Sequence, residues 1–357
     1  MNRLFLLAAT AICSLSAFGQ TEVTNYQAGI TENGITYFLP STQIRAVVTA
    51  TRTHHIPGEF CEYAERYLRL KDVIQTPYDT WKIEDIQLVP FGVADKSKAY
   101  SIKLKSKTSA PLVELTSDGR LVAINTQTEE DEDALPVPKV IKDQSKKLNG
   151  NDFKTEEILS AGSTSKMAEL SANEIYDIRE NRSLLTKGQA DFMPKDGEQL
   201  RLMLANLDMQ EEGLLQLFKG TSTQETHILA FDINATENIK QHLLFNFSKY
   251  LGVVDADDPA GFPVYLSIED QQSLPAVAEK SEKSKKEPED VRYIIPGRAL
   301  VRIFSDNKEY VSESIPLAQF GRIEHLGGEL FNKKSTTHVL LSPVTGGIVK
   351  LEAAQPE

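Results

Sequence analysis

The sequence is nearly free of cysteine. Its 357 residues include only Cys13 and Cys61, and Cys13 lies in the apolar stretch at the start of the chain. An exported chain that has lost this stretch keeps Cys61 alone, so an intramolecular disulfide is excluded and packing must stabilise the fold. Cys61 lies beside the apolar residues of a short predicted helix, and we interpret it as a small core residue.

Long apolar runs are also scarce. The one at the N-terminus, Leu4 to Phe18, follows Arg3 and leads into the small residues Ala17 and Gly19. This order is typical of a cleavable secretory signal peptide, which we assign to residues 1–19. No later stretch reaches the roughly 18 apolar residues of a membrane-spanning helix. We therefore expect an exported protein without a transmembrane span, in the periplasm or attached to the periplasmic side of the outer membrane.

Lipid attachment to Cys13 is an alternative to simple cleavage. Lipoprotein processing requires a small residue before the cysteine, and Ile12 occupies that position. The apolar run that precedes the cysteine, from Leu4 to Ile12, is also short. The sequence therefore favours cleavage without lipidation.

Positive charge is in short supply. The chain has 39 Lys and Arg against 51 Asp and Glu, which gives a formal net charge of −12. Removal of the signal peptide takes away Arg3 and makes the charge one unit more negative. Such a field repels nucleic-acid phosphate and anionic lipid, and no cluster of basic and aromatic residues reverses it locally. We therefore expect no nucleic-acid partner.

Signatures of catalysis and of cofactor binding are almost absent. The sequence contains no Gly-x-Ser-x-Gly, phosphate-loop, dinucleotide, His-Glu-x-x-His or Cys-x-x-Cys pattern. His54 and His55 form the only close pair of histidines, and neighbours on a strand point to opposite faces, so they cannot share one metal. We expect no cofactor and no metal, and we favour a non-enzymatic role over catalysis.

One segment resembles a catalytic motif. Ser163 and Lys166 have the Ser-x-x-Lys spacing of penicillin-binding enzymes at the start of a predicted helix. They are therefore candidate catalytic residues of a hydrolase. However, the Ser-x-Asn at Ser171–Asn173 comes only five residues after Lys166 on the same predicted helix, and Val344–Gly346 lacks the lysine of a Lys-Thr-Gly element. A helix-capping serine followed by a solvated lysine explains the same pattern.

A second segment resembles the start of a calcium loop. Asp255, Asp257 and Asp258 are candidate metal ligands. Pro259 follows them directly, and the spaced glycine and glutamate of a calcium loop are absent. A solvated acidic turn is the simpler interpretation.

Strand and helix patterns divide the exported chain into parts. Residues 20–127 have β-branched, alternating patterns with one short helix, and residues 128–155 form an acidic, proline-marked linker or loop. Residues 156–220 are helical, and residues 221–357 return to strand patterns with a mobile loop at 272–291. We predict an α+β fold in which β-rich N- and C-terminal modules are joined by a central antiparallel helical hairpin. The patterns leave open whether the two β segments form one domain or two.

The helical part carries an apolar stripe on each of two helices. The stripes consist of Met167, Leu170, Ile175, Ile178 and Leu185 on the first helix and of Leu200, Met203, Leu204, Leu207, Leu214, Leu215 and Phe218 on the second. The second helix begins after Asp196, which can cap the amide of Gln199, and ends at Gly220. Leu202 and Met209 lie opposite its stripe. They are candidate binding residues, because this side can be covered by a β module or by another protein.

The first helix also carries a dense run of charges. Asp177, Arg179, Glu180 and Arg182 lie within two helical turns. Pairs of this kind within one helix contribute only a few tenths of a kcal/mol each. We expect a solvated salt-bridge face, or an ordered contact if the arginines are buried between domains.

Several segments in collinear order resemble a known family. They are Tyr37–Thr42, Glu62–Leu68, Ala161–Leu170, Ile175–Arg179, Met193–Gly197 and Ser342–Gly346. Together they resemble exported, periplasmic Bacteroidota proteins that are defined only as a domain of unknown function. The resemblance spans nearly the whole exported chain and implies an envelope location in a Gram-negative cell, with no assigned reaction. Arg69 stands where the family has a glycine after the short helix, which affects only that turn.

The expected function follows from export, the open helix face and the missing catalytic constellation. We expect a non-catalytic interaction or scaffold protein of a Gram-negative envelope assembly, with envelope proteins as partners, including proteins of the outer membrane. Two alternatives stay open. One is a module that binds a cell-wall or surface glycan, and the other is a hydrolase with an unrecognised site.

Overall fold

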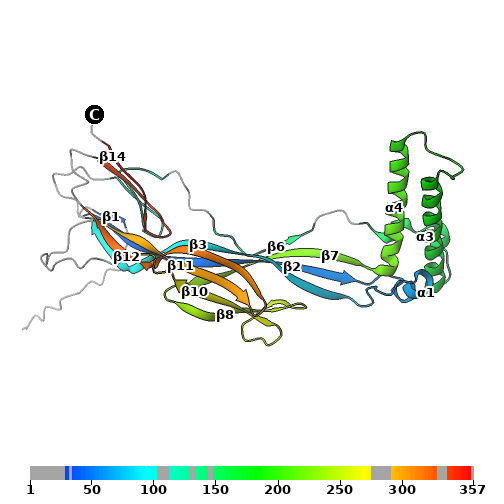
Figure 1. Ribbon diagram of the computed structural model, residues 1–357, viewed down its shortest axis with the longest axis horizontal. Coiled ribbons are helices and arrows are strands. Elements are labelled where there is room, and N and C mark those ends of the chain that lie inside the picture. Colours follow the sequence, from blue (N-terminus) through cyan, green and yellow to red (C-terminus); the bar gives the residue numbers. More distant parts are fainter. Residues whose placement is uncertain are drawn as a thin grey trace, which may run out of the picture.

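The computed structural model describes residues 29–31, 34–102, 112–128, 134–143, 148–274, 291–327 and 336–354. The predicted signal peptide, part of the acidic linker and most of the predicted mobile loop lie outside these ranges. Strands make up 51% and helices 23% of the structure, so the protein is β-rich. Figure 1 shows an elongated molecule in which three antiparallel sheets occupy one part and the two long helices stand at the opposite end.

A long antiparallel sheet, sheet A, runs through most of the molecule. Its strands are β1 (Gly29–Thr31), β2 (Gly34–Ile56), β3 (Tyr78–Ile102), β6 (Lys139–Lys142) and β7 (Thr221–Asn234). β2 is central: β3 pairs with it along one edge, β1 and β7 pair along the other, and β6 extends the sheet beyond β7. The sheet therefore joins residues that precede the helices to residues that follow them.

A β-bulge keeps the apolar side of β3 facing inward. Val48 of β2 pairs with Ile86, while Ala50 pairs with Ile83, so the register shifts by one residue between these pairs. Ile83, Ile86 and Leu88 are consequently all buried on one side although their spacing breaks the period of two.

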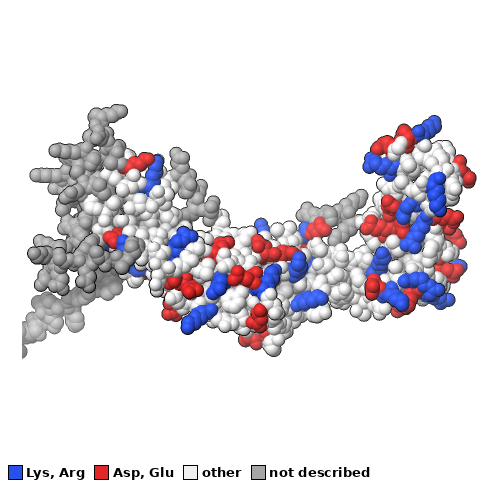
Figure 2. All heavy atoms as spheres, in the orientation of Figure 1, with Lys and Arg blue, Asp and Glu red and all other residues white. Residues whose placement is uncertain are grey.

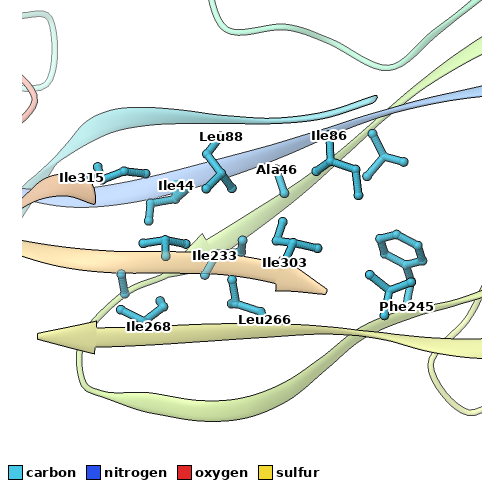
Figure 3. Close-up of a cluster of buried hydrophobic side chains, with 14 of the residues drawn as sticks. Ile44, Ala46, Ile86, Leu88, Ile233, Phe245, Leu266, Ile268, Ile303 and Ile315 are labelled. Carbon is cyan, nitrogen blue, oxygen red and sulfur yellow. The ribbon is translucent and has the colours of Figure 1, made fainter. Parts of the chain in front are cut away.

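Sheet C packs face to face against sheet A. Its strands, in spatial order, are β12 (Lys308–Leu326), β11 (Val291–Ser305), β10 (Phe262–Asp270), β8 (Ile239–Ser248) and β9 (Gly252–Val254). Figure 3 shows Ile44 and Ala46 of sheet A facing Leu266, Ile268 and Ile303 of sheet C. Because each fully buried aliphatic side chain contributes roughly 1.5–3 kcal/mol, this cluster is the main apolar core.

Sheet B completes the β body, which we define as sheets A, B and C. Its strands, in spatial order, are β14 (Ile348–Ala354), β13 (Thr336–Leu341), β5 (Leu121–Ile124) and β4 (Val113–Leu115). A second apolar cluster joins it to the other sheets through Tyr37, Leu39, Ile124, Ile294 and Val339. Strands from both ends of the sequence therefore share this core.

A buried polar joint fixes the three sheets together. The Thr42 hydroxyl is fully buried; it donates to the Val344 carbonyl (2.9 Å) and accepts from the Ala318 amide (3.1 Å). The buried Arg120 guanidinium binds both carboxylate oxygens of Asp118 in its own turn (2.8 and 2.9 Å), and it donates through Nη1 to the Pro343 carbonyl beside Val344. Because unpaired buried polar groups are costly, these complete sets of partners specify one arrangement of the segments.

The predicted α+β fold, in which a central helical hairpin joins two β modules, is wrong, because the protein is β-rich. β7 pairs with β2, and β13 pairs with β5, so the strands before and after the helices form shared sheets. The helices lie at one end of sheet A and do not connect two separate modules (Figure 1). Pairing between distant strands leaves no local pattern in a sequence, which is why periodicity did not indicate it.

The helical end, which we define as residues 57–77 and 148–220, is built from two excursions of the chain. The first contains a short 3₁₀ turn at Cys61–Tyr63 and α1 (Ala64–Leu68). The second contains a 3₁₀ turn at Gly150–Phe153, α2 (Glu156–Leu159), α3 (Thr164–Lys187) and α4 (Gly197–Lys219). None of the described helices has the length and hydropathy of a membrane-spanning segment.

A third apolar cluster lies inside the helical end. It contains Phe60, Ala64, Leu68, Ala168, Ala172, Ile175, Ile178, Leu214, Leu217 and Phe218. The Phe60 amide donates to the Leu217 carbonyl (2.7 Å), which ties the first excursion to α4. Cys61, a free thiol, is half-buried beside this cluster, and the structure contains no disulfide among its described residues.

Candidate functional site

The two long helices are positioned by local signals at their ends. The Ser163 hydroxyl accepts from the Lys166 amide (3.3 Å) at the start of α3, and the Asp196 carboxylate accepts from the Gln199 amide (2.7 Å) at the start of α4. Gly188 ends α3 in the left-handed conformation, with φ 70°. Capping side chains of this kind typically contribute about 1 kcal/mol each, so both helix starts are well defined.

A buried carboxylate clamps α3 to α4. Glu211 is only 9% exposed, and it accepts from Arg179 Nε (2.7 Å) and from Arg182 Nη2. Burial alone would raise the pKa of Glu211, but the hydrogen bonds and positive charges of the two arginines outweigh it and lower the pKa below its usual value. Arg179 and Arg182 of α3 therefore pair with a carboxylate of α4, and they are not part of a purely solvated face.

Sequence reasoning missed Glu211, although a signal was present. At 100° per residue this carboxylate falls in the middle of the apolar stripe of α4, between Leu207 and Leu214. A charged residue inside an apolar stripe requires a partner of opposite charge. Arg179 and Arg182 on the neighbouring helix provide two.

The outer face of α4, opposite its stripe, is covered at one end and open at the other. Near the base, the Phe153 ring packs so closely on Gly213 that a side chain at position 213 would clash with it. Further up the same face, Leu202 is 52% exposed and Met209 is 41% exposed. The segment predicted as a linker thus covers this face at Gly213, and the two candidate binding residues lie on its open part.

A groove opens at the tip of the helical end, where α3 and α4 are connected. Its volume is about 470 Å³, and its apolar lining comes from Leu184, Leu185, Ala190, Phe192, Met203 and Leu207. Phe192 itself is 65% exposed, and Met193 beside it is also exposed. Helix periodicity did not indicate this groove, because it depends on the conformation of the connection.

A larger cleft of about 820 Å³ lies where α4 meets sheet A. Its lining includes Arg182, Asp208, Glu211, Glu212 and Lys219. Arg182 also pairs with Asp208 (2.8 Å), so Arg182, Asp208 and Glu211 of this cleft are already bound to one another. The arrangement stabilises the base of the helices.

In the structure, the side chains of Ser163 and Lys166 have separate hydrogen-bond partners. The Ser163 hydroxyl caps α3, and the Lys166 ammonium binds the Glu169 carboxylate (2.9 Å) on the exposed side of the helix. The hydrogen bond from Glu169 raises the pKa of Lys166. A lysine that activates a serine needs the opposite shift, because it must lose its proton to act as a base.

The acidic turn that follows β9 is organised around an amide. Asn246, a buried residue of β8, donates through Nδ2 to the carbonyls of Asp258 (2.8 Å), Ala256 (3.1 Å) and Asp255 (3.4 Å). The side chain of Asn246 therefore occupies the centre toward which these carbonyl oxygens point. Asp257 is exposed. In the described ranges, no group of three or more His, Cys, Asp or Glu is arranged to hold a metal.

His54 and His55 have separate partners. Nδ1 of His54 lies 2.6 Å from the Asp79 carboxylate, which also accepts from Arg52 (2.6 and 3.1 Å). His55 instead lies 3.0 Å from the Thr80 hydroxyl. Hydrogen bonds from Arg52 and His54 lower the pKa of Asp79. The two rings share no hydrogen-bond partner, and each contact joins β2 to β3.

The segments that carry the family resemblance lie in two places. Tyr37–Thr42 and Ser342–Gly346 meet at the buried joint through the hydrogen bond from Thr42 to Val344. The helical end contains the other four: Glu62–Leu68, Ala161–Leu170, Ile175–Arg179 and Met193–Gly197. Within it the Tyr176 hydroxyl donates to the Tyr67 carbonyl (2.9 Å), which joins two of these segments directly.

Comparison with known proteins gives a family without an assigned activity. No curated protein and no solved structure matches the chain. Residues 33–349 match a family described as a domain of unknown function, DUF4831. This match includes the sheets and the helical end, so the chain belongs to the DUF4831 family.

Proposed function

We propose that this DUF4831 protein is a non-catalytic interaction or scaffold protein of a Gram-negative cell envelope. Its first 19 residues have the pattern of a secretory signal peptide, and its sequence resembles exported periplasmic proteins of Bacteroidota. Its partners in this proposal are other envelope proteins, including proteins of the outer membrane.

The partly covered outer face of α4 carries the proposal. Phe153 shows how a side chain docks on this face, since its ring fits against Gly213. Leu202 and Met209 continue the same face without an intramolecular cover. Burial of an exposed aliphatic side chain is favourable by roughly 25 cal/mol per Å² of apolar area, so an apolar side chain of a partner gains by extending the seam that Phe153 begins.

The surroundings of the candidate catalytic residues favour binding over catalysis. Ser163 is used as a helix cap, and Lys166 is held protonated by Glu169.

The glycan alternative also finds little support at the single tryptophan. A side chain on Gly252 would lie 2.7 Å from the Trp81 ring, and His227 packs against the ring at 4.6 Å, so Trp81 is not an open stacking platform.

Site-specific photocrosslinking in native envelopes tests the proposal. A benzophenone amino acid at position 202 or 209 should give a defined set of protein adducts. The matched control is position 251, because Leu251 of the β body is 57% exposed, close to the 52% of Leu202. Adducts at 202 and 209 but not at 251 would support an interaction face on α4. Identical adducts at all three positions, or none, would contradict it.

A charge substitution sharpens the same experiment. With the benzophenone at the exposed Ala205, which is not part of the tip groove, Leu202→Asp combined with Met209→Asp should abolish the adducts, because a buried unpaired carboxylate is strongly disfavoured. Leu251→Asp should leave them unchanged.

A further inference from the structure

We propose that two copies of the chain associate through the tips of their helical ends, with Phe192 of each copy inserted into the tip groove of the other. This inference goes beyond the proposed function, because it uses the tip groove and not the Leu202–Met209 face.

The tip presents a projection and a groove side by side. Phe192 is among the most exposed large apolar side chains of the described residues, and it stands at the margin of the 470 Å³ groove. Leu184, Leu185, Met203 and Leu207 line that groove with apolar surface. A surface that carries both shapes is self-complementary, which is the requirement for an interface with two-fold symmetry.

The local net charge at the tip is zero, so a second copy is not repelled there. The whole chain has a formal net charge of −12, so two copies repel each other on average. Within residues 187–201, however, Lys187, Lys195 and Arg201 balance Asp191, Asp196 and Glu198. Figure 2 shows acidic and basic side chains next to one another over the helical end. Glu198 already pairs with Arg201, and Asp196 caps α4, which leaves Lys187, Lys195 and Asp191 exposed at the tip. Two copies related by a two-fold axis can bring these lysines of one copy next to Asp191 of the other.

The position of the tip also permits this contact. Figure 1 shows the connection between α3 and α4 pointing away from the sheets, so the β bodies of two copies stay apart when the tips meet. The contact area is limited to a helix pair and one connection. We expect less than about 1,200 Å² in total and hence a weak, reversible dimer.

A concave groove distinguishes this proposal from insertion into a lipid surface. A membrane needs only projecting apolar side chains, and the balanced charges of residues 187–201 provide no excess of lysine and arginine to attract anionic headgroups. A protein side chain can fill the groove, whereas a planar membrane surface leaves it empty.

Sedimentation velocity of the purified full chain tests the inference. From about 1 to 200 μM, where weak association at a small interface becomes visible, the protein should shift reversibly from monomer to dimer. Phe192→Ser should raise the dissociation constant at least about tenfold. Tyr250→Ser is the matched control, because Tyr250 of the β body is 62% exposed and Phe192 is 65% exposed. A monomer at every concentration, or a dimer that Phe192→Ser does not weaken, would overturn the inference.

Spin-label distances give an independent readout. In a Cys13→Ser, Cys61→Ser background, nitroxides on Thr186→Cys, an exposed position next to the groove but outside its lining, should show a short distance between copies. Nitroxides on Asp306→Cys, in the turn between β11 and β12, should not. A short distance at 306 would place the contact elsewhere and overturn the inference. Binding of the monomer to phosphatidylethanolamine–phosphatidylglycerol vesicles that depends on Phe192 would assign the tip to a lipid surface and also overturn it.

The two proposals fail separately. Leu202→Asp with Met209→Asp should leave the dimer intact, and Phe192→Ser should leave the photocrosslinks at position 202 intact. Loss of the dimer in the double variant would contradict the assignment of self-association to the tip groove.

Discussion

The β body and the helical end are stabilised in different ways. The body has two apolar clusters that join strands from distant parts of the chain and a buried polar joint between its sheets. The helical end has one smaller cluster, two cap residues and the Glu211 clamp, and it exposes apolar side chains at its tip and outer face. Regions with few buried contacts open at lower free energy than densely packed ones. The comparison therefore predicts a rigid body that carries a less stable interaction surface.

Matched core truncations should separate the two regions most clearly. Leu266 in the body and Leu214 in the helical end are both fully buried. Truncation of a buried leucine to alanine typically costs 2–5 kcal/mol. Leu266→Ala should lower the free energy of unfolding of the whole protein by that amount, which is measured with urea. Leu214→Ala should weaken hydrogen-exchange protection only in α3 and α4. Equal loss of protection in the body amides after Leu214→Ala would show that the two regions unfold as one unit.

The buried joint should respond to a change that keeps the shape of the side chain. Thr42→Val removes the hydroxyl and leaves the Val344 carbonyl and the Ala318 amide without their buried partner. We expect a loss of about 2 kcal/mol in the free energy of unfolding, measured with urea. Thr42→Ser keeps the hydroxyl and should cost less. If the valine variant were as stable as the native protein, the hydrogen bonds of the Thr42 hydroxyl would not contribute to the stability of the β body.

The Glu211 clamp should make the helical end sensitive to acid. Because the folded-state pKa of Glu211 is lowered, its stabilising contribution is present above its unfolded pKa of about 4.3 and is lost as pH falls through the folded pKa. Glu211→Gln should cost about 1–2 kcal/mol at neutral pH, since it leaves two arginines beside a neutral amide. The check is hydrogen exchange of α3 and α4 against pH. The native helices should lose protection in acid more steeply than the variant, and parallel profiles would contradict the role of Glu211.

The sequence predicted local features well and long-range pairing poorly. Asp196 and Gly220 mark the beginning and end of α4 because caps act within a few residues. Helix periodicity also placed Leu202 and Met209 away from the core stripe. The pairing of Val47 with Ala230, by contrast, has no local signal. β12 has no regular strand pattern, because Pro316 and Gly321 interrupt its alternation, although a bulged strand at the edge of sheet C accommodates both.

The candidate site shows the same limit. Leu202 and Met209 could be identified because helix geometry alone sets the side on which they lie. Their exposure could not be predicted from the sequence, because it depends on how far the Gly150–Phe153 turn reaches along α4. The tip groove depends on the backbone of a connection, for which the sequence offered only Gly188 as a helix stop.

The smallest expected effect lies at Arg69, a residue with a Cβ in a left-handed conformation. Arg69 ends α1 with φ 59° and ψ 26°, and its amide bonds to the carbonyls of Ala64 and Glu65. A left-handed conformation costs an L-residue with a Cβ about 1 kcal/mol, and glycine adopts it without that cost. Arg69→Gly should therefore raise the stability of the helical end by about 0.5–1 kcal/mol, measured by hydrogen exchange of α1 and α3. Arg69→Ala removes the same side chain but keeps the Cβ, so it should give no gain; a gain equal to that of glycine would assign the effect to the lost guanidinium and not to the backbone.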